Sequence, residues 1–351
     1  MLETWGRVSA FVNKFTAMGL ILALTVAAAQ AQVSPPGTKV SADPSDVVRG
    51  RVNVRGSGKY FIGEPVVLRF TLSNHARSKL GIQTNFIPQS NLTIDIQAPG
   101  EGSRAYTGPF PPGRYPQIVF TLMPFDEFSE DVLVWSDPER PVGLAFDKPG
   151  EYIIQPSLMV EVIETKRVGK VPLEPIHIRV VDTPASLKPM IKRLAELKAF
   201  EKLQRRQVPD GSALEIEKML KQYPVSSMTP YILYAIANHY TFVLSEHPER
   251  HKEAFGKSLA YYQLAAQSDS ALKIPIFLDL LRFLDHEKRS TLATRIVQQL
   301  IKSLPPDIRG KIGGFEPIEK SKSGTYFPYL LKKYMINTPE LDREKYWQVL
   351  N

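Results

Sequence analysis

The feature that most constrains the fold is a change in the spacing of apolar residues at Asp182-Thr183-Pro184. Before this point apolar and polar residues alternate, as they do in half-buried antiparallel strands. After it, from Leu187 to Phe200, apolar residues recur at steps of three and four, which is typical of an amphipathic helix. The sequence therefore predicts an all-β part followed by a separate all-α part.

The all-β part is expected over residues 48–182. Pro and Gly clusters separate its alternating runs, which include GEPVVLRFTLSN, NLTIDIQAPG, QIVFTLMP, EDVLVWSD, EYIIQPSLMVEV and IHIRVV. About seven short strands of this kind are enough for a two-sheet sandwich.

One stretch, AFDKPGEYIIQPSL, has the pattern of a corner between two strands. We expect Phe146 to be buried, Pro149-Gly150 to turn the chain, and the Tyr152 hydroxyl to hydrogen-bond back to the backbone. Pro156 lies inside the run that follows. Because proline removes a ladder hydrogen bond, it predicts a bulge or a strand exposed on one edge.

With these runs and the FDKPGEY corner, residues 48–182 resemble an immunoglobulin-like β-sandwich of the kind found in exported bacterial proteins. The resemblance implies that Tyr152 is a tyrosine corner, at the start of the penultimate strand. The chain departs from the pattern in having no cysteine, and Ile154 stands where the second cysteine of such folds would be.

The all-α part is expected over residues 185–304. Ser212-Ala-Leu-Glu215 has the form of a capping box, and Thr229-Pro230 places proline at a helix start. Through Ser258, Tyr262 and Ala265, the segment SLAYYQLAAQSDS resembles the second helix of a tetratricopeptide repeat. The preceding turn is too long for the usual period and no second copy is evident. A degenerate repeat and a small helical bundle remain alternatives.

Residues 305–351 are expected to form a loop followed by an aromatic, partly helical tail. Aromatic residues at helical spacing favour packing of this tail onto the helices. The alternative is an aromatic and basic face exposed to a membrane surface or a partner.

Residues 1–31 have the form of a secretory signal peptide. Arg7 and Lys14 precede an apolar stretch from Phe15 to Ala29, and Ala29-Gln30-Ala31 is an A-x-A cleavage pattern;. An uncleaved anchor is the alternative. Residues 32–47, rich in Pro and Ser, are expected to be a linker. We predict an exported protein, periplasmic or extracellular and envelope-associated, with no membrane-spanning segment after signal removal.

Charge is unevenly distributed along the chain. Residues 45–184 contain 15 Lys and Arg against 16 Asp and Glu, whereas residues 185–351 contain 26 against 18. A basic surface suits an anionic polymer of the envelope or another envelope protein. The signal peptide argues against nucleic acid as the partner.

Candidate chemistry is sparse. His247 and His251 lie four residues apart, as two zinc ligands on a helix do, but Pro248 stands where the protease signature needs Glu. This favours a solvated turn. There is no G-x-S-x-G elbow, no phosphate loop and no cysteine;. We therefore expect no cofactor.

The sequence favours a non-catalytic binding or scaffold protein over an enzyme. The expected partner surface is a basic groove of the helical part, around Tyr231, Tyr234, Tyr261 and Tyr262. One alternative is an exported hydrolase whose metal or carboxylate site a single sequence does not reveal. Another is a peripheral membrane or envelope-polymer binder that uses the C-terminal half.

Overall fold

The computed structural model describes residues 43–299, apart from 111–116, 225, 269–271, 290, 294 and 297–298. The predicted signal peptide, most of the predicted linker and the C-terminal tail lie outside the described residues. None of the helices in the described part is long and apolar enough to cross a membrane.

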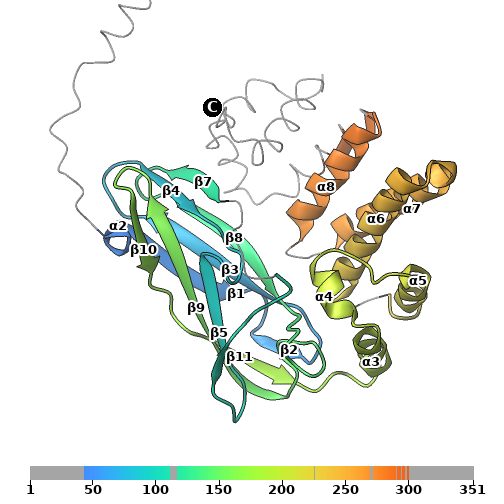
Figure 1. Ribbon diagram of the computed structural model, residues 1–351, viewed down its shortest axis with the longest axis horizontal. Coiled ribbons are helices and arrows are strands. Elements are labelled where there is room, and N and C mark those ends of the chain that lie inside the picture. The colour runs from blue at the N-terminus through green and yellow to red at the C-terminus, as the bar shows by residue number, and fades with distance from the viewer. Residues whose placement is uncertain are drawn as a thin grey trace, which may run out of the picture. The chain divides into compact units, whose positions relative to one another are not determined.

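Two sheets form the N-terminal half (Figure 1). The three-stranded sheet has the antiparallel order β1-β3-β8, with β1 at Val48–Val54, β3 at Val66–Asn74 and β8 at Glu127–Val134. The eight-stranded sheet has the order β2-β11-β9-β4-β7; in addition, β10 and β5 pair with β9, and β6 pairs with β5. Its strands are β2 (Lys59–Phe61), β4 (Leu80–Thr84), β5 (Leu92–Gln97), β6 (Ser103–Ala105), β7 (Ile118–Leu122), β9 (Gly150–Val162), β10 (Arg167–Val171) and β11 (Ile176–Val181).

The inner faces of the two sheets form one apolar core, as the alternating runs predicted. Along β9, the inward residues are all buried: Tyr152, Ile154, Leu158, Val160 and Val162. Phe70 and Leu72 of β3 belong to the same core. This arrangement is an immunoglobulin-like β-sandwich, in agreement with the predicted fold class.

Strand β9 decides between the two expectations for Pro156. It lies inside its sheet, and its register with β5 runs without interruption from Gln97↔Ile153 to Leu92↔Leu158, so there is no bulge here. Backbone groups alternate sides along a strand, and the Met159 N–H donates to the Asn91 carbonyl beside β5;. Pro156 therefore faces the opposite side, where β9 changes partner from β11 to β10. No described strand pairs with β9 between Ile154 and Leu158 on that side, so the strand is open on one edge, as the second alternative predicted, and no ladder hydrogen bond is lost.

The predicted corner has a definite geometry. The Tyr152 hydroxyl donates to the carbonyl of Lys148 and accepts from its N–H, both at 3.1 Å. Phe146 is 3% exposed and packs edge-on against the Tyr152 ring at 5.2 Å. Gly150 has φ of 139°, and a Cβ there would collide with Pro99. This is the arrangement of a tyrosine corner.

The end of the predicted linker is folded. Pro44–Val47 form a short helix, α2, with Asp43 and Asp46 completing a capping box. Pro44 and Val47 are buried. Gly169 of β10 packs closely against this helix, since a Cβ at position 169 would lie only 2.9 Å from atoms of both Asp43 and Pro44. These residues therefore belong to the edge of the sandwich.

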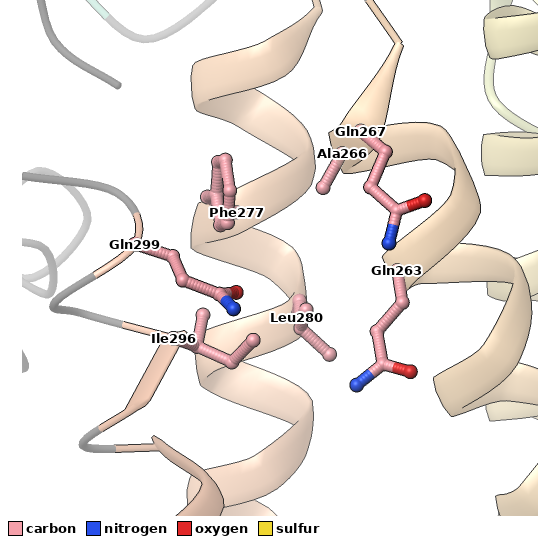
Figure 2. Close-up of a pocket in the computed structure, with 7 residues that line it drawn as sticks. All are labelled: Gln263, Ala266, Gln267, Phe277, Leu280, Ile296 and Gln299. Carbon is pink, nitrogen blue, oxygen red and sulfur yellow. The ribbon is translucent and has the colours of Figure 1, made fainter. Parts of the chain in front are cut away.

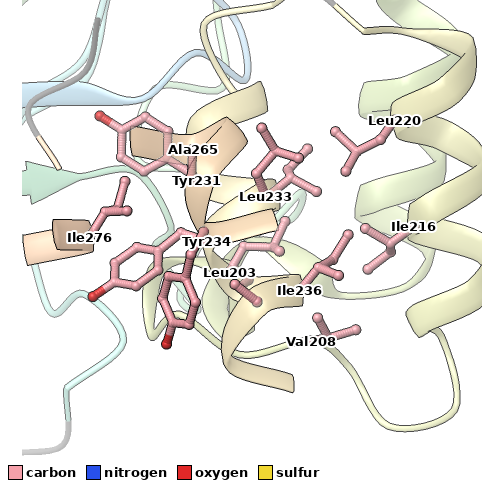
Figure 3. Close-up of a cluster of buried hydrophobic side chains, with 14 of the residues drawn as sticks. Leu203, Val208, Ile216, Leu220, Tyr231, Leu233, Tyr234, Ile236, Ala265 and Ile276 are labelled. Carbon is pink, nitrogen blue, oxygen red and sulfur yellow. The ribbon is translucent and has the colours of Figure 1, made fainter. Parts of the chain in front are cut away.

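The second half is helical, as predicted. It contains α3 (Lys188–Glu196), α4 (Ala199–Gln204), α5 (Ala213–Gln222), α6 (Thr229–Glu246), the 3-10 turn η1 (Pro248–Arg250), α7 (His251–Gln267) and α8 (Lys273–His286). The capping box expected at Ser212 is wrong, because the Ser212 hydroxyl donates to the Pro209 carbonyl and Glu215 pairs with Arg193. Helix α6 packs in the centre of the apolar cluster shown in Figure 3.

The sandwich and the helices share part of their core. Trp135, directly after β8, packs against Phe200 of α4 at 5.5 Å and Tyr231 of α6 at 5.6 Å. Val67 is buried in the same cluster, whereas its neighbour Leu68 belongs to the core between the sheets. Strand β3 is therefore buried on both faces, because the helices cover the outer face of its sheet.

A buried glutamine completes this junction. Gln204 of α4 accepts from the N–H of Ser136 at 2.7 Å and from its hydroxyl at 3.0 Å. Its amide nitrogen donates to the Leu133 carbonyl at 2.8 Å and to the Tyr106 hydroxyl at 2.9 Å. One side chain from the helical half thus satisfies polar groups of two separate segments of the sandwich.

The corner gives a first prediction. Tyr152→Phe removes the hydroxyl and leaves the ring in place, so the free energy of unfolding should fall by about 1 kcal/mol. Urea unfolding followed by circular dichroism measures the change. An unchanged stability would show that the hydroxyl contributes nothing to the turn.

Candidate functional site

The predicted tyrosine groove is wrong, because three of its four residues lie in the core. Tyr231 is 5% exposed, Tyr234 is fully buried and Tyr262 is 2% exposed. Tyr261 is half-buried and its ring stacks on Tyr240 at 6.1 Å. No partner could reach a surface formed by these rings.

The hydroxyls of two of these tyrosines are also satisfied within the helices. Tyr234 donates to Asp279 of α8, and the Arg206 guanidinium lies 5.2 Å above its ring. Tyr262 donates to Asn238 of α6 at 2.6 Å. These partners are remote in sequence, which is why the spacing of the tyrosines alone did not reveal that they are buried.

The two histidines diverge. His247 caps the end of α6 and its Nδ1 lies 3.3 Å from Glu249. His251 begins α7 and its Nε2 lies 2.8 Å from Glu287. Within the described residues, no group of three or more His, Asp or Glu side chains is placed to hold a metal ion.

The pocket in Figure 2 lies between α7, α8 and the helical residues that follow, and has a volume of about 330 Å³. Three amides and an apolar floor line it: Gln263, Gln267 and Gln299 with Ala266, Phe277, Leu280 and Ile296. None of these side chains titrates or is nucleophilic. The described side chains that line this pocket therefore offer no acid, base or nucleophile for catalysis;.

A polar cluster joins α5, α6 and α7. Lys257 Nζ donates to the Tyr240 hydroxyl at 2.9 Å and lies 3.3 Å from Glu253 and 3.8 Å from the buried Glu217. The hydrogen bond to Tyr240 raises the pKa of Lys257. Because Lys257 stays an ammonium group, it is a cross-link between helices and not a nucleophile.

The exposed feature that stands out is the edge strand β7. Within the described residues β7 pairs with β4 alone. Its sequence, IVFTL, contains no charge, and Ile118 and Val119 are 39% and 38% exposed. An exposed, uncharged edge presents unpaired backbone groups that a further strand can join.

The other edge strands in the described part carry protective features. The three-residue strands β2 and β6 are too short to template pairing;. Charged residues occupy the remaining edges: Arg49 and Arg51 on β1, Glu127, Glu130 and Asp131 on β8, and Arg167 and Lys170 on β10. β7 has neither protection.

The turn after β7 extends this apolar surface. Met123 is 55% exposed and Phe125 is 76% exposed. Phe125 has φ of 67°, a left-handed conformation that costs a non-glycine residue about 1–3 kcal/mol;. Two backbone hydrogen bonds to Asn74 hold the turn. The Phe125 N–H donates to the Asn74 carbonyl at 2.9 Å, and the Asn74 N–H donates to the Asp126 carbonyl at 3.0 Å. We call Ile118–Leu122 together with the turn 123–126 the β7 edge.

The interior beside the β7 edge contains a carboxyl group with a shifted pKa. Phe120 of β7 stacks on Phe128 of β8 at 4.1 Å, and Glu130 lies on the same face of β8 as Phe128. Burial raises the pKa of Glu130 to about 7; the charge of Asp131 adds to the shift and that of Arg206 opposes it. Glu130 therefore places an inward-facing acidic group on the edge strand β8, and an inward charge of this kind discourages pairing of β8 with another strand;.

Sequence reasoning identified QIVFTLMP as a strand but missed the significance of its edge. Residues that pair with it, such as Leu80 and Ile82, are some forty positions earlier in the chain, so its place in the sheet order was not visible. The absence of charge in a five-residue strand was the available signal.

Neither a protein family nor a curated protein matches this sequence. Among solved structures, a PapD-like domain of human CEP192 is similar with 12% identity and a TM-score of 0.24, over 44% of this chain and 98% of that one. The CARDB domain of a Pyrococcus furiosus protein has 10% identity and a TM-score of 0.20, over 42% and 100%. A β-glucosidase from Listeria innocua has 10% identity and a TM-score of 0.21, over 38% of this chain and 16% of its own length. Similarities this low carry no functional conclusion.

Glu130 gives a prediction about pH. Its folded pKa is about 7, above the ordinary 4.5, so the folded state binds more protons than the unfolded state between these values. Its contribution to stability is therefore lost as pH rises through this window. Glu130→Gln, which stays neutral, should exceed the wild type in stability by about 1–3 kcal/mol at pH 8 and by little near pH 4.5.

Urea unfolding of both proteins at pH 5 and pH 8 measures the difference. Glu139→Gln, at an exposed position, is the matched control. If Glu130→Gln and Glu139→Gln shift stability equally at both pH values, the pKa of Glu130 is not raised by burial.

Proposed function

We propose that this is an exported, non-catalytic binding or scaffold protein of the cell envelope. The observation that carries the proposal is strand β7 of the β7 edge, whose five residues are uncharged and partly apolar while the other described edge strands are charged or very short. A sheet edge kept open in this way suits addition of an extended segment from a partner, with main-chain hydrogen bonds giving affinity.

The binding surface in this proposal lies on the sandwich and not on the tyrosines of the helices. The partner is a polypeptide of the envelope, because an uncharged strand recognises a polypeptide backbone better than an anionic polymer. The signal-like residues 1–31 support export to the compartment where such a partner would be found.

The helices have a supporting role in the proposal. The two small residues behind the tetratricopeptide resemblance, Ser258 and Ala265, are fully buried, as is Ala237 of α6, and the Ser258 hydroxyl donates to the Ala237 carbonyl at 3.1 Å. This close contact between α6 and α7 is compatible with a degenerate repeat-like pair and with a small helical bundle alike. We infer that the pair braces the outer face of the three-stranded sheet.

Capture from native envelope extract tests the proposal. The full chain, Val119→Lys and Val168→Lys are compared as baits; Val168 is a 60% exposed valine on the charged strand β10. We expect the wild type and Val168→Lys to retain the same envelope proteins and Val119→Lys to lose them, because a lysine on the edge opposes strand pairing.

Removal of residues 185–351 is a poor substitute for this comparison, because it would expose Trp135 and Val67 to solvent. Envelope proteins held equally by all three baits would contradict docking at the β7 edge. In that case the exposed helical surface becomes the site to examine.

A further inference from the structure

We propose that a second copy of this chain occupies the β7 edge, pairing β7 with β7 antiparallel across a two-fold axis to continue the eight-stranded sheet (Figure 1). The inference rests on the proposed function, since it names the occupant of the same edge. In this arrangement the protein is a symmetric scaffold whose two helical halves are held by paired sandwiches.

Charge favours self-pairing of this strand above the other edges. In a two-fold contact each strand meets its own copy, so charged residues meet like charges. Two copies of β8 would bring acidic residues together, and two copies of β1 or β10 would bring basic residues together;. Two copies of β7 meet without any charge.

The strand is also complementary to itself in shape. An antiparallel register centred on Phe120 sets Val119 opposite Thr121 of the second copy, and Ile118 opposite Leu122 of the second copy. Val119 and Thr121 are exposed on the outer face, and β-branched residues make favourable cross-strand pairs;. Ile118, 39% exposed in one copy, would be covered by the second.

The turn supplies area that five strand residues lack. A stable interface buries on the order of 1,000 Å² or more in total. In the same register Met123 lies opposite Gln117 of the second copy, and Phe125 extends beyond the end of the paired strands. These two exposed apolar side chains enlarge the contact, and the short strand limits it, so we expect a dissociation constant in the micromolar range, roughly 1–100 µM.

Sedimentation velocity of the purified full chain from about 1 to 200 µM measures the association. Two double variants separate this register from a general effect of surface charge. Val119→Glu with Thr121→Glu places carboxylates opposite each other and should weaken the dimer roughly tenfold or more. Val119→Glu with Thr121→Lys places a carboxylate opposite an ammonium in both halves and should restore the dimer, with a dependence on salt.

Val168→Lys on β10, opposite Glu161 of β9, is the control for added charge, and should dimerise as the wild type does;. Circular dichroism and thermal unfolding confirm that each variant is folded. A wild type that stays monomeric to 200 µM would overturn the inference, as would a dimer that both double variants leave unchanged or both abolish while folded.

The two proposals fail separately. A monomeric chain that still retains envelope proteins through Val119 would overturn self-pairing and leave the proposed function standing. If the chain is monomeric and Val119→Lys retains the same envelope proteins as the wild type, both proposals are wrong.

Discussion

The structure depends on the junction at Gln204. This side chain makes four hydrogen bonds, to Ser136, Leu133 and Tyr106 of the sandwich, while it is only 7% exposed. Buried polar groups are costly when they lose their partners, so α4 cannot leave this position without stranding donors and acceptors on both sides. Trp135, packed between α4 and α6, adds apolar contact at the same place. The sandwich and the helices are therefore one body in energetic terms, although their sequences have different periods.

This junction decides which surfaces are left for a partner. The helices cover the outer face of the three-stranded sheet, where Val67 and Trp135 would otherwise be exposed. The charged side chains of β8 protect the free edge of that sheet. In the eight-stranded sheet the long strand β9 is paired on one side with β11 and β10 and on the other with β5 and β4, apart from a short gap at Pro156. Strand β7 is then the uncharged edge strand that remains, and this is the physical basis for proposing recognition there.

Much of the fold was predictable because its causes are local. The alternation of apolar and polar residues along Tyr152–Val162 identified the buried face of β9, and the Pro-Gly turn before Tyr152 identified the corner. The features that were missed depend on residues far apart in the sequence. Which of the two outcomes predicted for Pro156 occurs depends on where β9 changes partner, and the burial of Tyr234 depends on Asp279 of α8. The continuous apolar run Val66-Val67-Leu68 was a signal that β3 is covered on both faces. It was missed because the rest of the strand alternates between apolar and polar residues. For the candidate site, the strand was predictable and its position at the edge was not.

Native-state hydrogen exchange tests the central claim, that the sandwich and the helices unfold as one cooperative unit. Amides of β9 and of α6 are followed by mass spectrometry in rising urea. The account predicts that the slowest amides of both segments converge on one opening free energy and one dependence on urea. Helical amides that open at a distinctly lower free energy, while β9 stays protected, would show two independent units and contradict the account.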